Sequence, residues 1–296
     1  MKALLGLIRT MRPKQWTKNG AVFVALVFDA KVFQFAPLLR TLAGFVLMCL
    51  LVGAVYIIND LADLEKDRQH PTKRNRPLPS GELPVPVAIV GAVVLLAIAL
   101  PLALWLNLTF GLLLTLYLIL QLAYSFLLKH YVLVDVIAIA AGFVIRVGAG
   151  VPLVPADRFS PWLYVCTTLL ALFLALGKRR QELVMLEGNA ESHRAILREY
   201  SVAYLDELIN VVVSAAIVAY SLYTFTAENM PPNHAMMLTI PFPMYGLFRY
   251  LYLIHIRGET AAPDEVFLKD RPIQLTVVLW GMLSFGLLFW HRLQAG

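Results

Sequence analysis

The chain has 296 residues, of which 59% are hydrophobic and only 15% are charged. About a quarter of the residues in soluble domains are charged, so this composition excludes an ordinary soluble protein and indicates an integral membrane protein. The formal net charge of +6 would also suit a nucleic-acid partner. Most of the cations lie next to apolar segments, however, and we therefore predict no nucleic-acid binding.

The chain begins with MKALLGLIRTMRPKQW, which differs from a secretory signal peptide. Arg9 interrupts its short apolar run, and no small-residue cleavage pattern follows. Both cysteines, Cys49 and Cys166, lie inside apolar runs. We interpret them as small buried residues and not as a disulfide framework.

Nine apolar segments follow one another along the chain, and crossing a bilayer core takes about 20 residues. The segments cover residues 20–36, 41–61, 85–105, 108–127, 132–150, 161–177, 207–226, 236–254 and 272–292. The first is the weakest, because Asp29 and Lys31 interrupt it. We therefore predict an all-α integral membrane protein with nine transmembrane helices.

The basic residues gather on one side of these segments. If the N-terminus lies in the cytoplasm and the nine segments alternate in direction, 20 Lys and Arg residues are cytoplasmic and 4 lie on the opposite side. This bias follows the positive-inside rule and requires an odd number of spans. Nearly all acidic residues share the cytoplasmic side, which favours a site at that face over a polar transport path through the membrane.

An acidic stretch, NDLADLEKDR, begins at residue 59, where the second apolar segment ends. If the helix continues past the membrane surface, four oxygen-bearing side chains fall within an arc of about 100°. These side chains are Asn59, Asp60, Asp63 and Asp67. They repel one another unless a cation joins them, and oxygen ligands suit Mg²⁺, whose shell substrate phosphates normally complete. We predict a magnesium site here.

Cations surround and follow this acidic stretch. Lys73, Arg74 and Arg76 are interpreted as contacts for substrate phosphates, and the alternative is a loop held by anionic lipid headgroups. For the acidic stretch, the alternative to a metal site is a solvated helix end neutralised by Lys66 and Arg68.

NDLADLEKDR resembles the first Asp-rich motif of the UbiA superfamily of intramembrane prenyltransferases. The resemblance covers essentially the whole chain. It implies a single transmembrane domain over residues 1–296, with nine helices around a central cavity open to the cytoplasm. Cytoplasmic cap loops are then expected near residues 62–84, 178–206 and 255–271.

Aromatic prenyltransferases of this superfamily typically carry a second Asp-rich motif after the sixth helix. Here that place reads GKRRQE, residues 177–182, with three cations and Glu182 as its one carboxylate. This composition suits a binding site for an anion better than a second magnesium–diphosphate site.

Five local stretches resemble one branch of the superfamily, the decaprenyl-phosphate phosphoribosyltransferases. They are RPKQWTKN at 12–19, HPTKRNRP at 70–77, YSFLLKH at 124–130, GKR at 177–179, which is interpreted as a turn, and DRPIQ at 270–274. The resemblance implies transfer of 5-phosphoribose from phosphoribosyl diphosphate to a polyprenyl phosphate, with release of diphosphate. It further implies a bacterial-type inner membrane, a cytoplasmic active site, and a product used as a cell-envelope pentose donor.

The predicted chemistry needs several cationic contacts because the two substrates carry three separate anionic groups. Magnesium held by Asn59, Asp63 and Asp67, with Asp60 a weaker candidate, would neutralise the departing diphosphate. The lipid phosphate is already ionised near neutral pH, since its second pKa is about 6, and it needs no dedicated general base. Electrostatics and proximity would supply most of the rate.

Nine further residues are predicted to contact the substrates. They are Lys18, Tyr124, Lys129, Asp135, Arg146, Lys178, Arg179, Glu182 and Arg271. Lys18, Lys129, Lys178 and Arg179 are assigned to the 5-phosphate or the lipid phosphate. Tyr124, Asp135 and Glu182 are assigned to ribose hydroxyls or to orienting the cations.

Arg146 lies inside an apolar segment, eleven residues or about three turns after Asp135. A central Arg costs about 2.5 kcal/mol or more on insertion scales, so it needs a partner. Two interpretations stay open: a cavity residue that meets the lipid phosphate or the sugar, and a structural pair with a backbone carbonyl or another helix's polar group. Gly142 and Gly150 indicate close helix packing nearby.

The polar segment 187–207 places Tyr200 and Tyr204 four residues apart. We predict an amphipathic cytoplasmic helix that covers the cavity, with a simple connector as the alternative.

Two other functions remain as alternatives: an aromatic prenyltransferase that uses a prenyl diphosphate, and a membrane lipid carrier. GKRRQE argues against the first and the one-sided charges against the second. An oligomeric assembly stays open.

Overall fold

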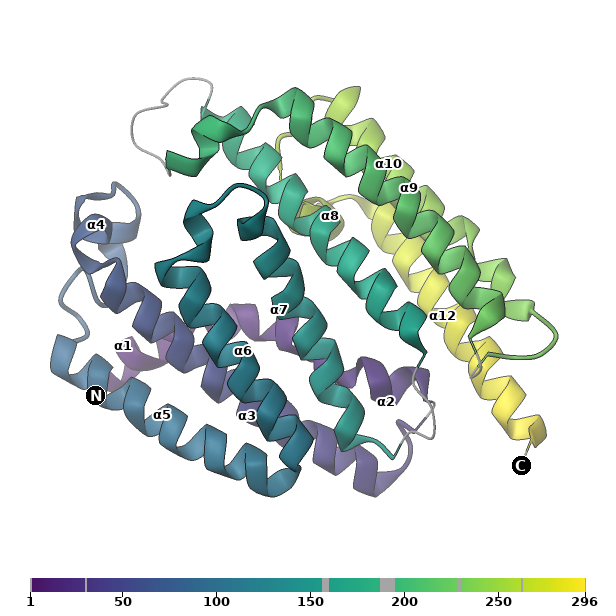
Figure 1. Ribbon diagram of the computed structural model, residues 1–296, viewed down its shortest axis with the longest axis horizontal. Helices are drawn as coiled ribbons and strands as arrows, with labels where there is room; N and C mark the ends of the chain where they lie inside the picture. The colour runs from purple at the N-terminus through teal and green to yellow at the C-terminus, as the bar shows by residue number, and fades with distance from the viewer. Residues whose placement is uncertain are drawn as a thin grey trace. The chain divides into compact units, whose positions relative to one another are not determined.

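The computed structural model describes residues 2–29, 31–155, 160–186, 195–227, 230–261 and 263–295. These residues form α-helices and 3₁₀ helices, and none of them lies in a β-strand (Figure 1). The chain divides into two compact units. Unit 1 comprises Met1–Val27, Lys31–Phe126 and Ile145–Ala156, and unit 2 comprises Phe28–Ala30, Leu127–Val144 and Asp157–Gly296.

The helices of the first half, in chain order, are α1 (Lys2–Thr10), a 3₁₀ helix (Pro13–Phe23), α2 (Val24–Phe28), α3 (Phe35–Ala62), α4 (Leu64–Gln69), a 3₁₀ turn (Lys73–Asn75), α5 (Val85–Leu106) and α6 (Leu108–Phe126). The second half contains 3₁₀ helices at Leu128–His130, Val151–Leu153, Ala195–Glu199 and Ala235–Thr239. Its α-helices are α7 (Val134–Gly150), α8 (Pro161–Leu186), α9 (Val202–Thr226), α10 (Pro241–His255), α11 (Pro263–Lys269) and α12 (Arg271–Ala295).

Seven helical segments among the described residues are long and apolar enough to cross a membrane. They are Phe35–Ala62, Val85–Leu106, Leu108–Phe126, Val134–Leu153, Pro161–Met185, Val202–Thr226 and Arg271–Trp290. Helices suit this environment because each satisfies its own backbone polar groups. The predicted span 236–254 corresponds to the 3₁₀ helix Ala235–Thr239 followed by the 15-residue α10.

The predicted span 20–36 is not one helix. It divides into the end of a 3₁₀ helix, the five-residue α2 and the start of α3. The helix is broken at the polar connection between α2 and α3, where the Lys31 ammonium donates to the carbonyl of Pro155. The total of nine spans stays a prediction.

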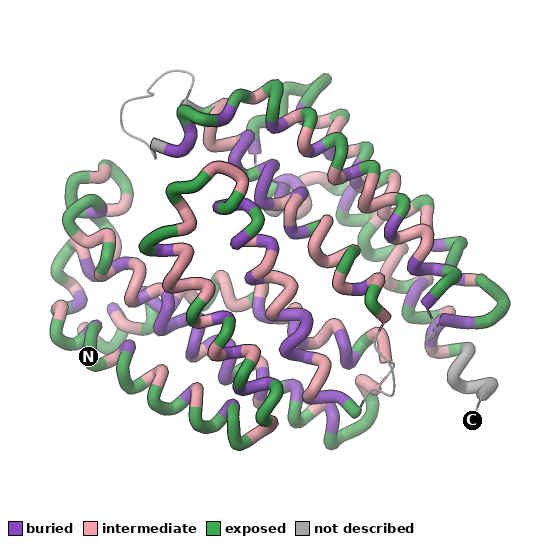
Figure 2. Tube along the Cα trace, viewed as in Figure 1, coloured by how far each residue is buried: buried purple, intermediate pink, exposed green. Residues whose placement is uncertain are grey.

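In unit 1, the most buried helix is α3, which packs against α1, α5 and α6 (Figure 1). Met48 and Leu51 of α3 share a buried core with Phe110 and Leu114 of α6. Helix α5 is largely exposed and buries only a stripe of four alanines, 88, 92, 99 and 103 (Figure 2). Small side chains allow the α5 and α3 backbones to approach closely, which is how helices associate in lipid.

Gly150 ends α7 at a close approach of two backbones. A Cβ atom at this position would collide with the carbonyl oxygen of Val22 in the 3₁₀ helix Pro13–Phe23. The close packing that was predicted around Gly150 is therefore present in unit 1.

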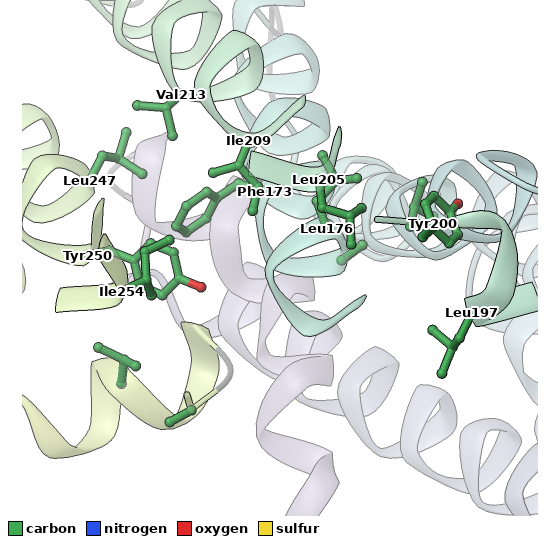
Figure 3. Close-up of a cluster of buried hydrophobic side chains, with 14 of the residues drawn as sticks. Phe173, Leu176, Leu197, Tyr200, Leu205, Ile209, Val213, Leu247, Tyr250 and Ile254 are labelled. Atoms are coloured by element: carbon green, nitrogen blue, oxygen red, sulfur yellow. The ribbon is translucent and has the colours of Figure 1, made fainter. Parts of the chain in front are cut away.

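In unit 2, α9 packs against α8 and α10, and α11 packs against α8 and α12. Figure 3 shows the core that these helices share, with Phe173 of α8 pointing toward Tyr250 of α10. The two rings meet edge to face, with centroids 4.9 Å apart. Tyr200 lies at one end of the same cluster.

Two predicted boundaries in unit 2 were wrong. GKRRQE is not a turn, because α8 continues through it to Leu186 and so removes the first nine residues from the expected loop 178–206. The expected helix 187–207 is also interrupted: after the 3₁₀ helix Ala195–Glu199, Ser201 caps α9 by accepting from the Tyr204 N–H at 3.1 Å. Residues 187–194 of that prediction lie outside the described residues.

Candidate functional site

The acidic stretch lies at the end of α3, where the helical path is broken once. Asp63 follows α3 with φ −97° and ψ 10°, and α4 begins at Leu64. The Asp67 N–H still donates to the Asp63 carbonyl at 2.8 Å, so the break is local. The predicted uninterrupted helix is therefore wrong at Asp63. Aspartate is a poor interior helix residue because its side chain competes for backbone hydrogen bonds.

Asp60 and Asp67 are nevertheless brought together, because both contact one guanidinium. Arg76 Nη1 lies 2.7 Å from Asp67 Oδ2 and 3.4 Å from Asp60 Oδ1. Arg12 Nη2 lies 2.5 Å from Asp60 Oδ1, and Lys73 Nζ lies 3.6 Å from Asp67 Oδ1. The two carboxylate side chains are only 4% and 3% exposed, so solvent screens these pairs less than surface ion pairs.

Arg12 reaches Asp60 from an unusual backbone conformation. Its φ of 53° and ψ of 63° are left-handed, which costs a non-glycine residue about 1–2 kcal/mol. The guanidinium also lies over the Tyr56 ring, 4.6 Å from the centroid, one helical turn before Asp60. Arg12 therefore combines an ion pair with a cation–π contact on one face of α3.

The loop after α4 is shaped by His70. Its Nδ1 accepts from the backbone N–H groups of Thr72 at 3.3 Å and Lys73 at 3.4 Å. These contacts form the turn from which Lys73 and Arg76 reach back to the carboxylates. Arg74, between them, points to solvent.

Asn59 is linked to α6. The Ser125 hydroxyl contacts Asn59 Oδ1, although 66 residues separate the two in the chain. This contact places the stretch that begins at Tyr124 beside the end of α3 within unit 1. Tyr124 and Lys18 are both half-buried.

Magnesium binding depends on the oxygen donors at the end of α3. The described residues include no group of three His, Cys, Asp or Glu side chains arranged to hold a metal ion. Magnesium, however, usually takes only one or two protein carboxylates and completes its shell with water and substrate phosphates. Asn59, Asp60, Asp63 and Asp67 supply only oxygen donors, so the residues fit this ion in chemistry.

Arg146 is buried in unit 1 and paired with another helix. Its Nη2 donates to the Tyr117 hydroxyl of α6 at 2.5 Å, and the guanidinium lies 4.9 Å from the centroid of the same ring. Arg146 therefore has a polar partner on another helix, as one of the two interpretations predicted, and its contact with a substrate stays a prediction.

Unit 2 holds a second charged cluster, on α7 and α8. Arg179, 2% exposed, donates from Nε to Asp135 Oδ2 at 2.7 Å and from Nη1 to Glu182 Oε2 at 2.5 Å. Asp135 is fully buried, whereas the Glu182 side chain is 27% exposed. The guanidinium and Asp135 are thus committed to each other, and the Glu182 carboxylate is the member that reaches solvent.

Two further arginine–carboxylate pairs join helices of unit 2. Arg180 of α8 contacts Asp206 of α9 at 2.5 Å, and Arg249 of α10 contacts Asp270 at 3.1 Å. Asp270 also caps α12 by accepting from the Ile273 N–H at 3.0 Å.

The remaining predicted cations of unit 2 lie nearer to solvent. Lys178 and Arg271 are exposed, and Lys129 is half-buried in the 3₁₀ helix Leu128–His130.

Four residues near the candidate ligands were missing from the predicted site. They are Arg12, Tyr117, Ser125 and Tyr200, each of which contacts a predicted site residue. Arg12 and Ser125 lie inside stretches that carried the resemblance, so the motifs contained a signal for them. Tyr117 and Tyr200 had no such signal.

A model described as the UbiA prenyltransferase family matches residues 20–269. The chain belongs to the UbiA prenyltransferase family. This UbiA family member is 32% identical over 287 residues to the Decaprenyl-phosphate phosphoribosyltransferase of Mycolicibacterium smegmatis, covering 93% of this chain and 90% of that relative. It is 31% identical over 283 residues to the protein of the same name from Corynebacterium glutamicum, covering 93% and 84% of the two chains.

Among solved structures, a UbiA homologue from Archaeoglobus fulgidus bound to DMAPP and Mg²⁺ superposes with a TM-score of 0.72. The two sequences are 20% identical, and the superposition covers 95% of this chain and 98% of that one. This likeness establishes the fold. The resemblance to the superfamily and to its decaprenyl-phosphate phosphoribosyltransferase branch is confirmed, as is the prediction of a transferase enzyme.

Proposed function

We propose that this UbiA family member transfers 5-phosphoribose from phosphoribosyl diphosphate to a polyprenyl phosphate and releases diphosphate, with Mg²⁺. The proposal rests first on two relatives that carry the name Decaprenyl-phosphate phosphoribosyltransferase and match 93% of this chain. It also rests on the buried carboxylates Asp60 and Asp67, which lie among Arg12, Lys73 and Arg76. That cluster suits a diphosphate, because both signs of charge are needed to bind it together with a metal.

We further propose how the protein is arranged in its membrane. The protein would be a single domain of nine transmembrane helices around a cavity open to the cytoplasm, in a bacterial-type inner membrane. The positive-inside bias of 20 to 4 supports the orientation.

Roles in unit 1 follow from the contacts. Asn59, Asp63 and Asp67, with Asp60 as a weaker candidate, would hold Mg²⁺, which would neutralise charge on the diphosphate leaving group. Lys73, Arg74 and Arg76 would contact the donor phosphates. Lys18 would take the 5-phosphate or the lipid phosphate, Tyr124 would meet the ribose, and Arg146 would meet the sugar or the lipid phosphate.

In unit 2, the roles differ by burial. The exposed Lys178 and Arg271 and the half-buried Lys129 would contact phosphates. Glu182 would accept from a sugar hydroxyl. Arg179 and Asp135, both buried, would hold Glu182 in place.

The bond changes are simple. A lipid phosphate oxygen would form a bond to the anomeric carbon as the bond from that carbon to the diphosphate oxygen breaks. Positive charge builds on the ribose, and the carboxylates of the cluster offset it. No proton has to move, so fixed charges and proximity would provide the rate enhancement.

The test is a transfer assay with purified protein. Phosphoribosyl diphosphate labelled in its ribose is incubated with polyprenyl phosphate, with and without Mg²⁺, and label is counted in the organic phase. We expect magnesium-dependent transfer, and we expect Asp63→Ala to abolish it while the protein stays folded. Activity on a prenyl diphosphate and an aromatic acceptor instead, with no ribose transfer, would contradict the proposal.

A further inference from the structure

Tyr200 occupies a junction in unit 2 that the proposed reaction has not used. It is 6% exposed and lies at one end of the core cluster (Figure 3). Its hydroxyl donates to Asp135 Oδ1 at 2.8 Å and accepts from the Leu133 N–H at 2.7 Å. One phenol thus joins α7, the connection before α7, and the segment before α9.

Each of the two bonds leads toward a proposed substrate contact. Asp135 holds Arg179, and Arg179 holds the partly exposed Glu182. Leu133 ends the connection that carries Lys129, and it does so with φ 64°, a left-handed conformation that a leucine adopts at a cost. The hydrogen bond from the Leu133 N–H stabilises that conformation.

The direction of these bonds is well determined by chemistry. A carboxylate accepts only, so Tyr200 must donate to Asp135 and use its oxygen lone pair for Leu133. Burial raises the pKa of the Tyr200 phenol above its ordinary value, so the proton stays on the oxygen across the physiological range.

We infer that Tyr200 is a positioning residue. It fixes the positions of Glu182 and of the connection 128–133, which carries Lys129, so that both can contact the sugar-phosphate donor. This inference rests on the proposed function. A fixed carboxylate repels phosphate but accepts well from a hydroxyl, so Glu182 selects the part of the donor that a prenyl diphosphate lacks. The lipid substrate has no sugar hydroxyl, so its binding does not depend on Glu182.

The test compares Tyr200→Phe with Tyr204→Phe. Tyr204 stacks on Tyr200, with ring centroids 6.5 Å apart, and its backbone N–H donates to Ser201. We expect Tyr200→Phe to raise KM for phosphoribosyl diphosphate about tenfold, because two buried groups lose their partner. KM for polyprenyl phosphate stays within about twofold in the same variant. Both constants stay at the wild-type value in Tyr204→Phe.

A double mutant separates positioning from general support of the fold. Glu182→Gln, on a partly exposed side chain, raises KM for the donor. Adding Tyr200→Phe raises it further by less than Tyr200→Phe does in the wild-type protein, because the Glu182 contact is already lost and only the Lys129 connection remains to be disturbed. Independent, fully additive free-energy effects would overturn the inference. So would a Tyr200→Phe protein that loses kcat alone, through a smaller folded fraction, with KM unchanged.

Amide exchange provides a readout that needs no substrate. Peptides covering residues 128–133 should exchange faster in Tyr200→Phe than in wild type or Tyr204→Phe; equal protection in all three would overturn the positioning of this connection. If wild-type protein does not turn over phosphoribosyl diphosphate, the proposed function fails and the Glu182 role fails with it. The exchange result then decides independently whether Tyr200 holds the connection.

Discussion

At the scale of single residues, Asp60 and Asp63 have different surroundings although three positions separate them. Asp60 is buried between the guanidinium groups of Arg12 and Arg76. Asp63 is half-buried at the break between α3 and α4. We therefore expect Asp60 to orient the arginines and Asp63 to meet the metal.

Asparagine substitutions distinguish the two carboxylates. Asp63→Asn should raise the Mg²⁺ concentration for half-maximal activity about tenfold, with little change in Tm. Asp60→Asn should lower Tm, because the partly exposed guanidinium groups lose a charged hydrogen-bond partner at a cost of about 1–3 kcal/mol, and should shift the Mg²⁺ requirement less. A Mg²⁺ titration and a thermal melt on each variant suffice. Equal Mg²⁺ shifts would place Asp60 among the ligands.

The raised pKa of Tyr200 predicts an alkaline effect on stability. Burial makes the folded state keep this proton above pH 10, the ordinary pKa of the phenol, while the unfolded chain has begun to lose it. The stability that Tyr200 provides is therefore complete below about pH 10 and declines as the pH rises above it. Thermal melts between pH 8 and 11 should show the difference between wild type and Tyr200→Phe shrinking above pH 10. A constant difference would argue against this shift.

At the scale of helices, glycine substitutions report on backbone contact. Gly150→Ala should destabilise the protein by about 1–3 kcal/mol, because a Cβ meets the Val22 carbonyl and overpacks the contact. Gly246→Ala, inside α10 with open space around the position, should be neutral or stabilising by up to about 1 kcal/mol. Thermal or denaturant unfolding of both variants checks this. A Gly150→Ala protein as stable as Gly246→Ala would show that the two backbones separate easily.

Helices could be predicted wherever apolar composition alone decides them. The predicted spans 85–105 and 108–127 agree with α5 and α6 to within a residue. The extension of α8 through GKRRQE was missed because its two arginines are paired with Asp135 and Asp206, which are distant in sequence. A local pattern of charges carries no information about such partners.

The same limit applies to the candidate site. Helical periodicity grouped Asp60 with Asp67, and both do contact Arg76. The pairing of Arg12 with Asp60 spans 48 residues and depends on the path of the chain through the 3₁₀ helix, which periodicity does not encode.

At the scale of the whole molecule, the charge bias predicts which loops face the cytoplasm. Ser80, in the exposed loop before α5, is expected inside, and Pro232, in the exposed loop after α9, is expected outside. Single cysteines at these positions, with Cys49 and Cys166 replaced by alanine, should react with an impermeant maleimide from opposite sides of sealed vesicles. Labelling of both from one side would contradict the odd number of spans that is predicted between these two loops.

The left-handed backbone at Arg12 limits which residues can replace this arginine without loss. Glycine accepts the conformation but has no charge, lysine keeps the charge but not the flat surface over Tyr56, and alanine has neither advantage. Arg12→Gly therefore removes the guanidinium and relieves the backbone strain, whereas Arg12→Ala removes the guanidinium and keeps the strain. The difference in the free energy of unfolding between these two proteins measures the cost of the left-handed backbone at residue 12.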